Sequence, residues 1–552
     1  MDTRGTRCGR ISRYHNIGHL LYEQATFRPA DPFLIFAPSG VLTLTYGQTL
    51  RLASLAADRL ARLGLERGDR LGIVGHNTPE FLVHYFAAHL LGLVPVPVNP
   101  ALATREICFI LRNCSARAVF FDRGLAALCS AVKAQAEGAL LAEVLDGHSE
   151  SGLESLSRQP PPQLRKPDLA VTPADPAALL YTSGTTGKPK GVVLTHRNFL
   201  ADAGALVDWF RFEPGARTLC ALPMFHNNGQ VITLLSPLLV GGSTVILDPK
   251  TVFASFWPMI AHYSVQWTSV MPAFLTTFLE YGMPRQDETL RGIVCGGQVL
   301  PDAVARRFEE QYRVPIFEGY GLTETTSFAC MNRYPAERRC PGSIGCPLPC
   351  NDMLITDEAG RELPAGEPGE IVIRGDNVAP GYHELPDVTA QRYADGWLHT
   401  GDFGWRDAAG NFYFATRKDD LIIRGGENIY PAEIENALYA IDGVVDCAAI
   451  GIPDPILGEA VCAYVKVAPG STLCEDLLRE GCRDLIADFK VPRRFILVNS
   501  LQELPEIPKG PTRKILRREL RRHFASFVAL EASAVPGNPL RAAVRVVRGS
   551  AR

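Results

Sequence analysis

The stretch Tyr181-Thr-Ser-Gly-Thr-Thr-Gly-Lys-Pro-Lys-Gly191 follows an apolar run, Ala177 to Leu180, that is typical of a buried strand. Its eleven residues include four Ser or Thr hydroxyls, three glycines and two lysines. Glycines let backbone N–H groups approach a ligand closely, hydroxyls donate hydrogen bonds, and lysines offset negative charge. The stretch therefore predicts a strand followed by a polyphosphate-binding loop. The candidate ligands are Thr182, Ser183, Gly184, Thr185, Thr186, Gly187, Lys188 and Lys190.

This loop differs from the P-loop of phosphoryl-transfer enzymes. A P-loop has a glycine five positions before its Gly-Lys pair and a Ser or Thr after it. Here Thr182 stands at the first place and Pro189 at the second. A P-loop enzyme is therefore the weaker alternative. A plain polar loop would not need so many glycines and hydroxyls together.

Helix and strand periods alternate around the loop, and this pattern predicts an α/β fold with parallel sheets covered by helices. Helices are predicted over Thr49 to Leu63, Pro79 to Leu91 and Thr104 to Asn113, and strands over Arg70 to Val74, Val94 to Val98 and Ala118 to Phe121.

Composition indicates a soluble globular protein of more than one domain, because 46% of the 552 residues are apolar. The 56 Lys+Arg and 59 Asp+Glu give a formal charge of −3, so no bulk basic field is available to bind nucleic acid. No apolar stretch offers the ~20 residues of a transmembrane segment. No signal-peptide type of apolar run follows the N-terminal arginines, so we expect a cytoplasmic protein. The Arg-rich, acid-poor start leaves an organelle transit peptide as an alternative.

The fourteen cysteines lack regular spacing and indicate reduced thiols rather than a disulfide framework. Cys330, Cys340, Cys346 and Cys350 lie close together in sequence. No pair among them has the C-x2-C or C-x4-C spacing of a zinc site, so we favour scattered small hydrophobic residues over a metal site.

Two changes of composition mark the C-terminal part of the chain. The segment Pro341 to Asp402 is rich in Gly and Pro and includes β-type runs such as Glu370 to Arg374, so several short strands are expected. A cluster of charged residues followed by glycines, Arg417 to Gly426, predicts a hinge into a smaller domain. The last helix is expected over about Ile515 to Phe527. Its arginines, Arg517, Arg518, Arg521 and Arg522, are expected on a solvated face.

Seven further motifs follow the loop in a characteristic order. They are Leu222-Pro-Met-Phe-His226, Gly296-Gly297-Gln298, Glu318-Gly-Tyr-Gly-Leu-Thr-Glu324, Gly396-Trp-Leu-His-Thr-Gly-Asp402, Arg417-Lys-Asp-Asp-Leu421, Gly425-Gly-Glu-Asn-Ile-Tyr-Pro431 and Lys514-Ile-Leu516. With the loop, they resemble the adenylate-forming superfamily, which includes acyl-CoA synthetases, adenylation domains and luciferases, over roughly residues 20 to 525.

The resemblance implies both an architecture and an activity. The expected architecture is a large N-terminal AMP-binding domain of helix-covered parallel sheets over residues 1–418, with a small β-barrel-like subdomain at about 341–416. It is hinged to a small, mobile α+β C-terminal domain over 419–530, which a tail follows at 531–552. The implied activity is ATP- and Mg²⁺-dependent conversion of a carboxylic acid to an acyl-adenylate, with release of pyrophosphate, and then transfer to coenzyme A.

The resemblance also assigns nucleotide and metal ligands. Thr323 matches a hydroxyl on the α-phosphate, and Glu324 matches the Mg²⁺ ligand, a role for which a carboxylate is chemically suited. Tyr320 would lie against adenine, with Gly297 and Gln298 along the base and the adenylate. Asp402 and Arg417 match the positions that hold the ribose hydroxyls.

Other assignments by resemblance concern catalysis and domain motion. Lys514 matches the lysine that bridges carboxylate and α-phosphate during adenylation, where a cation stabilises the transition state. Asp419 matches the hinge, and Gly425 and Gly426 match the tunnel for the pantetheine thiol. Two departures from the family pattern, Arg513 and Thr416, stand where glycine is usual; the first puts the efficiency of adenylation in doubt.

The acyl pocket is assigned by the same resemblance to His226, Asn227, Asn228, Val231, Met271 and Phe274. Relatives that activate amino acids commonly have an aspartate at the place of His226, and its absence disfavours a substrate ammonium. The mixed lining favours a medium-sized acyl or aryl acid, hence fatty acid or aryl acid metabolism. A carrier protein's phosphopantetheine remains an alternative acceptor to coenzyme A. A nucleotide-binding protein without catalysis remains a third interpretation.

Overall fold

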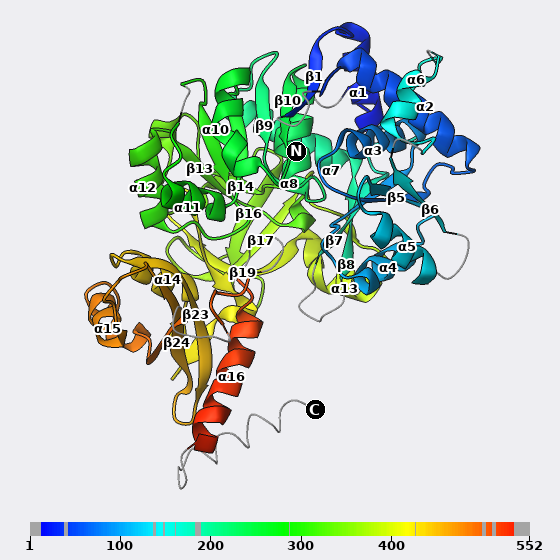
Figure 1. Cartoon of the computed structure of the whole chain (residues 1–552). Helices are drawn as coiled ribbons and strands as arrows, with labels where there is room; N and C mark the ends of the chain where they lie inside the picture. Colours follow the sequence, from blue (N-terminus) through cyan, green and yellow to red (C-terminus); the bar gives the residue numbers. More distant parts are fainter. Residues whose placement is uncertain are drawn as a thin grey trace. The chain divides into compact units, whose positions relative to one another are not determined.

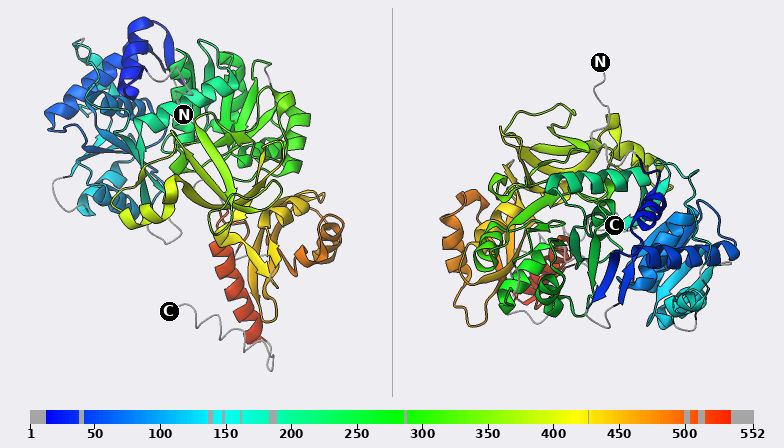
Figure 2. Two further views of the ribbon diagram at one scale, coloured as in Figure 1. Left: turned by 180° about the vertical axis from the view of Figure 1, so that it is seen from behind. Right: turned by 90° about the horizontal axis from the view of Figure 1, so that it is seen from above.

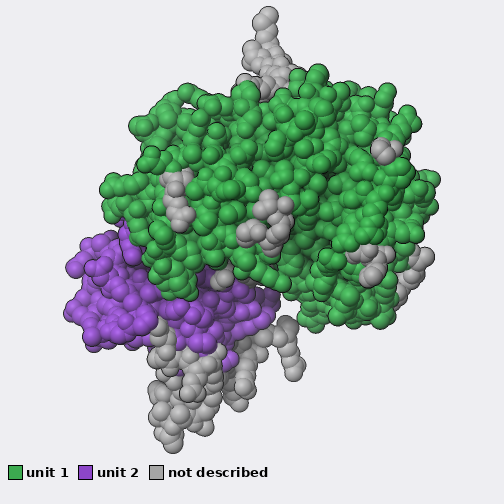
Figure 3. All heavy atoms as spheres, turned by 45° about the horizontal axis from the view of Figure 1, so that its top comes forward, with its two compact units in different colours: residues 1–297, 308–354, 372–400 green, residues 298–307, 355–371, 401–552 purple. Residues whose placement is uncertain are grey.

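The computed structural model describes residues 13–37, 42–135, 140–146, 149–160, 162–182, 189–285, 288–425, 427–498, 504–509 and 515–534. The chain forms two compact units (Figure 3). Unit 1 comprises Met1–Gly297, Phe308–Leu354 and Val372–Thr400. Unit 2 comprises Gln298–Arg307, Ile355–Ile371 and Gly401–Arg552.

Unit 1 contains an all-parallel sheet of four strands in the order β4-β3-β5-β6. The strands are β3 (Arg70–Val74), β4 (Val94–Val98), β5 (Ala118–Asp122) and β6 (Leu141–Leu145), and helices α2 (Tyr46–Arg62), α3 (Pro79–Leu91), α4 (Thr104–Asn113) and α5 (Ala126–Gln135) accompany them. Phe120 packs in one core with α3, whereas Phe121 packs in another with α4 and α5. The sheet therefore has helices on both faces, as Figures 1 and 2 show in blue and cyan. This confirms the predicted helix-covered parallel sheet.

A second sheet of unit 1 has nine strands in the order β15-β14-β13-β12-β11-β9-β10-β1-β2. Its strands are β1 (Pro32–Ala37), β2 (Leu42–Thr45), β9 (Arg217–Cys220), β10 (Ser243–Leu247), β11 (Trp267–Val270), β12 (Gly292–Cys295), β13 (Ile316–Tyr320), β14 (Cys330–Met331) and β15 (Cys346–Pro347). The central pairs are parallel, whereas β2, β14 and β15 pair antiparallel. The carboxyl ends of β11, β12 and β13 consequently meet at one edge, where α/β folds place ligands.

The third sheet of unit 1 is antiparallel, in the order β18-β8-β7. Strands β7 (Pro176–Thr182) and β8 (Lys190–Thr195) form a hairpin, and β18 (Gly381–Tyr382) pairs with β8. This antiparallel sheet accompanies the parallel sheets predicted for the body. Two parallel strands need a long crossover, whereas seven residues separate β7 from β8.

The Gly- and Pro-rich segment forms the short strands that its sequence predicts. Strands β16 (Asn351–Thr356), β17 (Gly369–Gly375), β19 (Leu398–Arg406) and β20 (Phe412–Arg417) make a sheet in that order.

The C-terminal part of unit 2 is an α+β fold. Strands β21 (Ile422–Arg424), β22 (Glu427–Ile429), β23 (Val444–Asp454), β24 (Gly458–Val467) and β25 (Arg494–Leu497) form one sheet, with helices α14 (Pro431–Tyr439), α15 (Glu475–Arg483) and α16 (Arg517–Ala534). Helix α16 begins two residues later than predicted and continues seven residues beyond Phe527. No Gly or Pro interrupts the sequence before Pro536, so nothing local stops the helix at Phe527.

Candidate functional site

The two strands of a hairpin flank the predicted phosphate loop. Thr182 at the end of β7 is the register partner of Lys190 at the start of β8. The predicted phosphate ligands between them, Ser183 to Lys188, lie outside the described residues. The structure thus places the two ends of the loop side by side.

Glu324 lies close to this hairpin. It belongs to a 3₁₀ turn, η2 (Thr323–Thr325), shortly after β13, and it is buried. The Tyr382 hydroxyl donates a hydrogen bond of 2.6 Å to Glu324 Oε1. Tyr382 also lies opposite Val192 of β8, and the Lys190 ammonium is 5.7 Å from the Tyr382 ring centre. Residues from three distant segments, Lys190, Glu324 and Tyr382, therefore meet at one place.

Tyr382 is a site residue that the sequence analysis missed. Burial, and then the neighbouring carboxylate of Glu324, raise the pKa of Tyr382, so the hydroxyl keeps its proton and donates a hydrogen bond to the carboxylate. The only sequence signal is a tyrosine in Pro380-Gly-Tyr382, within the Gly- and Pro-rich segment for which several short strands are predicted. Its partner Glu324 is 58 residues away in sequence, and only the folded chain shows that the two meet.

The predicted adenine-binding residues lie at the ends of two adjacent parallel strands. Tyr320 ends β13, and Gly297 follows β12 in a left-handed conformation with φ of 86°. A Cβ on Gly321 would come within 1.9 Å of the Ser327 carbonyl oxygen, so only glycine fits beside Tyr320. Gln298, the next predicted residue, is assigned to unit 2.

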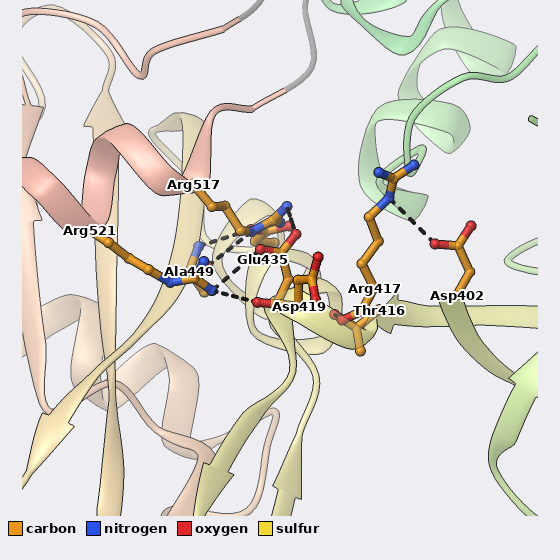
Figure 4. Close-up of polar contacts among 9 residues, drawn as sticks. Asp402, Thr416, Arg417, Asp419, Glu435, Ala449, Arg517 and Arg521 are labelled. Atoms are coloured by element: carbon orange, nitrogen blue, oxygen red, sulfur yellow. Dashed lines mark hydrogen bonds and ion pairs between the residues drawn. The ribbon is translucent and has the colours of Figure 1, made fainter. Parts of the chain in front are cut away.

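Asp402 and Arg417, fifteen residues apart in sequence, lie directly opposite each other on β19 and β20. Arg417 Nε is 3.4 Å from Asp402 Oδ1 (Figure 4). The Asp402 side chain is 3% exposed and the Arg417 side chain 41%, so the arginine holds a buried carboxylate and stays accessible to a ligand. The departure at Thr416 is accommodated in the strand, where its buried hydroxyl donates to the Arg417 carbonyl at 3.3 Å.

The predicted acyl-pocket residues come from two segments that a hydrogen bond joins. His226 precedes the short helix α8 (Asn227–Gln230), which runs into a π-helical turn beginning at the buried Val231. The Ser269 hydroxyl of β11 donates to Asn228 Oδ1 at 2.9 Å, immediately before the segment that carries the other two predicted residues. Those residues are Met271 and the buried Phe274, which precede and belong to α11 (Pro272–Tyr281). Desolvation lowers the pKa of His226 to about 4, so near neutral pH its imidazole carries no charge.

The predicted hinge is tied to the last helix by ion pairs (Figure 4). Lys418 to Asp420 form a short 3₁₀ turn. Arg517 Nη1 lies 3.6 Å from Asp420 Oδ2, and Arg521 Nη2 lies 3.3 Å from Asp420 Oδ1. Arg521 Nη2 also donates to the Asp419 carbonyl at 3.3 Å. Gly425, with φ of 61°, donates its N–H to the Leu457 carbonyl at 2.7 Å.

These contacts correct the prediction for the arginines of α16. The Arg517 side chain is only 16% exposed and donates to Glu435 Oε1 at 2.6 Å and to the Ala449 carbonyl at 3.2 Å. Arg518 and Arg522 are exposed, as predicted. Arg517 is therefore part of a buried ion-pair cluster rather than of a solvated face.

We expect Arg517→Met to destabilise the C-terminal domain by about 3–5 kcal/mol, because it leaves Glu435 buried without its cation. Burial already raises the pKa of Glu435, and Arg517 opposes that rise. Without the arginine the folded-state pKa of Glu435 rises further above its unfolded value, so protonation relieves the penalty and the loss should be smaller at about pH 5 than at about pH 8. Native-state hydrogen exchange of α14 and β23 measures the effect. The matched control is Arg518→Met, at the neighbouring exposed position, and equal losses in the two variants would contradict the assignment.

Three predicted residues of the C-terminal region lie outside the described residues: Lys514, the neighbouring Arg513, and Gly426.

The thirteen cysteines within the described ranges are all free thiols. No helix among the described residues is both long and apolar enough to cross a membrane.

Comparison with known proteins gives a match over most of the chain. The family model described as AMP-binding enzyme matches residues 21–383, and the model described as AMP-binding enzyme C-terminal domain matches residues 433–514.

Individual relatives match over nearly their whole length. The sulfoacetate–CoA ligase of Cupriavidus necator is 33% identical, over 92% of this chain and 98% of the relative. A fatty acid–[acyl-carrier-protein] ligase of Streptomyces coeruleorubidus is 34% identical, over 87% of this chain and 92% of the relative. Among solved structures, an anthranilate CoA ligase in complex with anthranoyl-AMP has a TM-score of 0.84 at 26% identity, covering 92% of this chain and 97% of that one.

Proposed function

The chain belongs to the family of AMP-binding enzymes, and from that premise we propose how its residues divide the work of an AMP-forming acid–thiol ligase. The enzyme activates a carboxylic acid with ATP, releases pyrophosphate, and transfers the acyl group from the adenylate to coenzyme A. A carboxylate is a poor electrophile, and its conversion to a mixed anhydride with AMP supplies a good leaving group for the thiol step. The hydrogen-bonded group of Glu324 and Tyr382 beside the phosphate-loop hairpin is the observation that carries the proposal.

We propose that Glu324 holds Mg²⁺ and that Thr323 contacts the α-phosphate. The donor set fits this ion, since a carboxylate and a hydroxyl are the hard oxygen ligands that Mg²⁺ prefers. Bound there, the ion would offset charge on the phosphates of ATP. Tyr382 would fix the orientation of the Glu324 carboxylate through its 2.6 Å hydrogen bond.

The remaining nucleotide contacts are assigned to the strand ends and to the Asp402–Arg417 pair. Tyr320, Gly297 and Gln298 would lie along the adenine and the adenylate. Asp402, held in place by Arg417, would accept hydrogen bonds from the ribose hydroxyls. The phosphate loop and Lys514 would supply the donors and the cation at the phosphates.

For the acid we propose a medium-sized acyl or aryl carboxylic acid. The neutral His226, the polar Asn227 and Asn228, and the apolar Val231, Met271 and Phe274 form a lining without a fixed charge. Such a lining offers no anion to a substrate ammonium. A relative that acts on anthranilate, an aryl acid, supports the proposal.

We further propose that the C-terminal domain begins at Asp419 and rotates there between the half-reactions. We also propose that the enzyme works in the cytoplasm, where free thiols persist. Coenzyme A is the thiol acceptor. A carrier protein is the second candidate acceptor, and the relative from Streptomyces coeruleorubidus, which acts on an acyl carrier protein, favours testing it.

The test is an acid panel assayed by exchange of labelled pyrophosphate into ATP, followed by product analysis. With its correct acid the enzyme should release AMP and pyrophosphate, and ADP with orthophosphate as primary products would contradict the proposal. Free coenzyme A and phosphopantetheinylated carrier proteins are then compared as acceptors of the activated acid. A strong preference for a carrier protein would replace coenzyme A as the acceptor. AMP binding without exchange for any acid would favour the non-catalytic interpretation.

A further inference from the structure

A strained turn follows Glu324 directly. Thr326 has φ of 66° and ψ of −65°, a conformation that a β-branched residue rarely adopts. The Ser327 N–H donates to the Thr325 carbonyl at 2.8 Å, which closes a γ-turn around Thr326. Strain of this kind persists only where the surrounding structure holds it, and it gathers at functional sites.

Two buried side chains hold the far end of this turn. The Phe328 N–H donates to Asp202 Oδ2 at 3.2 Å, and the Asn377 amide donates to the Phe328 carbonyl at 2.9 Å. The Thr326 hydroxyl in turn donates to the Asn377 carbonyl at 2.7 Å. Asp202, Asn377 and Thr326 are all fully buried. Burial raises the pKa of Asp202.

The helix that carries Asp202 also holds the segment that contacts Glu324. Asn198 and Asp202, four residues apart on α7 (His196–Phe210), share one face of the helix. The Asn198 amide donates to the carbonyls of Asp376 and Val378 at 2.7 and 2.9 Å. Beyond this anchor, the Ala379 N–H donates to the Glu324 carbonyl at 2.8 Å, and Tyr382 binds the Glu324 carboxylate.

We propose that Asn198, Asp202 and Asn377 are positioning residues that maintain the strained turn at Thr326 and thereby fix the Glu324 carboxylate. None of them touches substrate in this proposal, and they act through the backbone on either side of Glu324. The inference rests on the proposed function in one respect, the role of Glu324 toward Mg²⁺·ATP. We call these three residues and their hydrogen bonds the clamp. Without the clamp, Thr326 would relax to negative φ and displace the Glu324 carboxylate.

The test combines a truncation, a conservative variant and a strain-relieving variant. Asp202→Ala should lower the maximal rate of pyrophosphate exchange by about 10- to 100-fold, since small displacements of catalytic groups cost that much. The Mg²⁺ concentration for half-maximal rate should rise, while KM for the acid stays unchanged. Asp202→Asn, which keeps the acceptor oxygen, should retain most activity. Asp208→Ala, at an exposed aspartate of the same helix, is the control and should leave both values unchanged.

The double variant Asp202→Ala with Thr326→Gly tests decisively whether strain at Thr326 causes the loss of rate. Glycine adopts positive φ without strain but loses the hydrogen bond from the Thr326 hydroxyl to the Asn377 carbonyl, so the double variant should regain part of the lost rate. Loss of packing alone would lower thermal stability without this recovery. Failure of Thr326→Gly to restore any activity would overturn the proposal.

Hydrogen exchange of residues 322–329 in the unliganded protein gives a readout that needs no activity. Asp202→Ala should speed this exchange. If exchange is unchanged, or speeds up without any change in Mg²⁺ dependence, the positioning role is wrong. If the wild-type protein shows no pyrophosphate exchange with any acid, the proposed function fails, whereas the clamp on the turn is still tested by hydrogen exchange.

Discussion

Lys514→Ala should lower the rate of acyl-adenylate formation by ~10²-fold or more and leave thioester formation from supplied acyl-adenylate almost unchanged. In adenylation two anions, the carboxylate and the α-phosphate, must approach each other. A preorganised ammonium offsets their repulsion and stabilises the pentavalent transition state. Thiol attack on the finished adenylate brings no second anion to the α-phosphate, so that step does not need the lysine. Single-turnover assays of the two half-reactions measure the difference.

The control for this variant addresses the unusual residue before the lysine. Arg513→Gly restores the family pattern and should keep or raise the adenylation rate, since the lysine itself is unchanged. Equal losses in both half-reactions of Lys514→Ala would show that the lysine supports the fold, or that Arg513 has changed how this segment works.

Gly426→Leu and Asp419→Pro should both exchange pyrophosphate into ATP yet accumulate acyl-adenylate without forming thioester. Gly426 is the neighbour of Gly425, whose φ of 61° places it in a tight turn between β21 and β22. A leucine at 426 would fill the space that we assign to the pantetheine arm. A proline at 419 fixes a backbone dihedral at the residue where we place the rotation between the half-reactions. Quenched-flow measurement of adenylate and thioester separates the two steps.

Graded variants control both substitutions. Gly426→Ala should slow thioester formation less than Gly426→Leu, because its side chain is smaller. Asp419→Ala removes the side chain but keeps the dihedral free, so it should make thioester at close to the wild-type rate. Thioester formation at the wild-type rate in Gly426→Leu or Asp419→Pro would remove that residue from the second half-reaction.

Elements with strong local signals could be predicted from the sequence. Helix α3 spans Pro79–Leu91, as predicted, because Thr78 caps its start, proline occupies its first turn, and Gly92 ends it with φ of 73°. Strands β3 and β4 also match their predicted ranges, since their apolar runs are bounded by turn residues.

Features that depend on distant partners could not be predicted. Arg517 looks like a surface charge in sequence, yet it pairs with Glu435, 82 residues away. Tyr382 gains its meaning only from Glu324, and Thr326 carries no local sign of its strain. In each case tertiary contacts override what the local pattern favours. The hairpin of β7 and β8 was missed for a different reason, because the loop motif was recognised but the strand after it was not.

Isotope transfer tests the central claim, acid activation by adenylation, most directly. The acid is labelled with ¹⁸O in its carboxylate, and the reaction runs with ATP, Mg²⁺ and coenzyme A. Attack of the carboxylate on the α-phosphorus places a labelled oxygen in the P–O–C bridge, and the later thiol attack at the carbonyl carbon breaks the C–O bond. Mass spectrometry should therefore find ¹⁸O in AMP. Label in orthophosphate, with none in AMP, would mean activation through an acyl phosphate and would contradict the account.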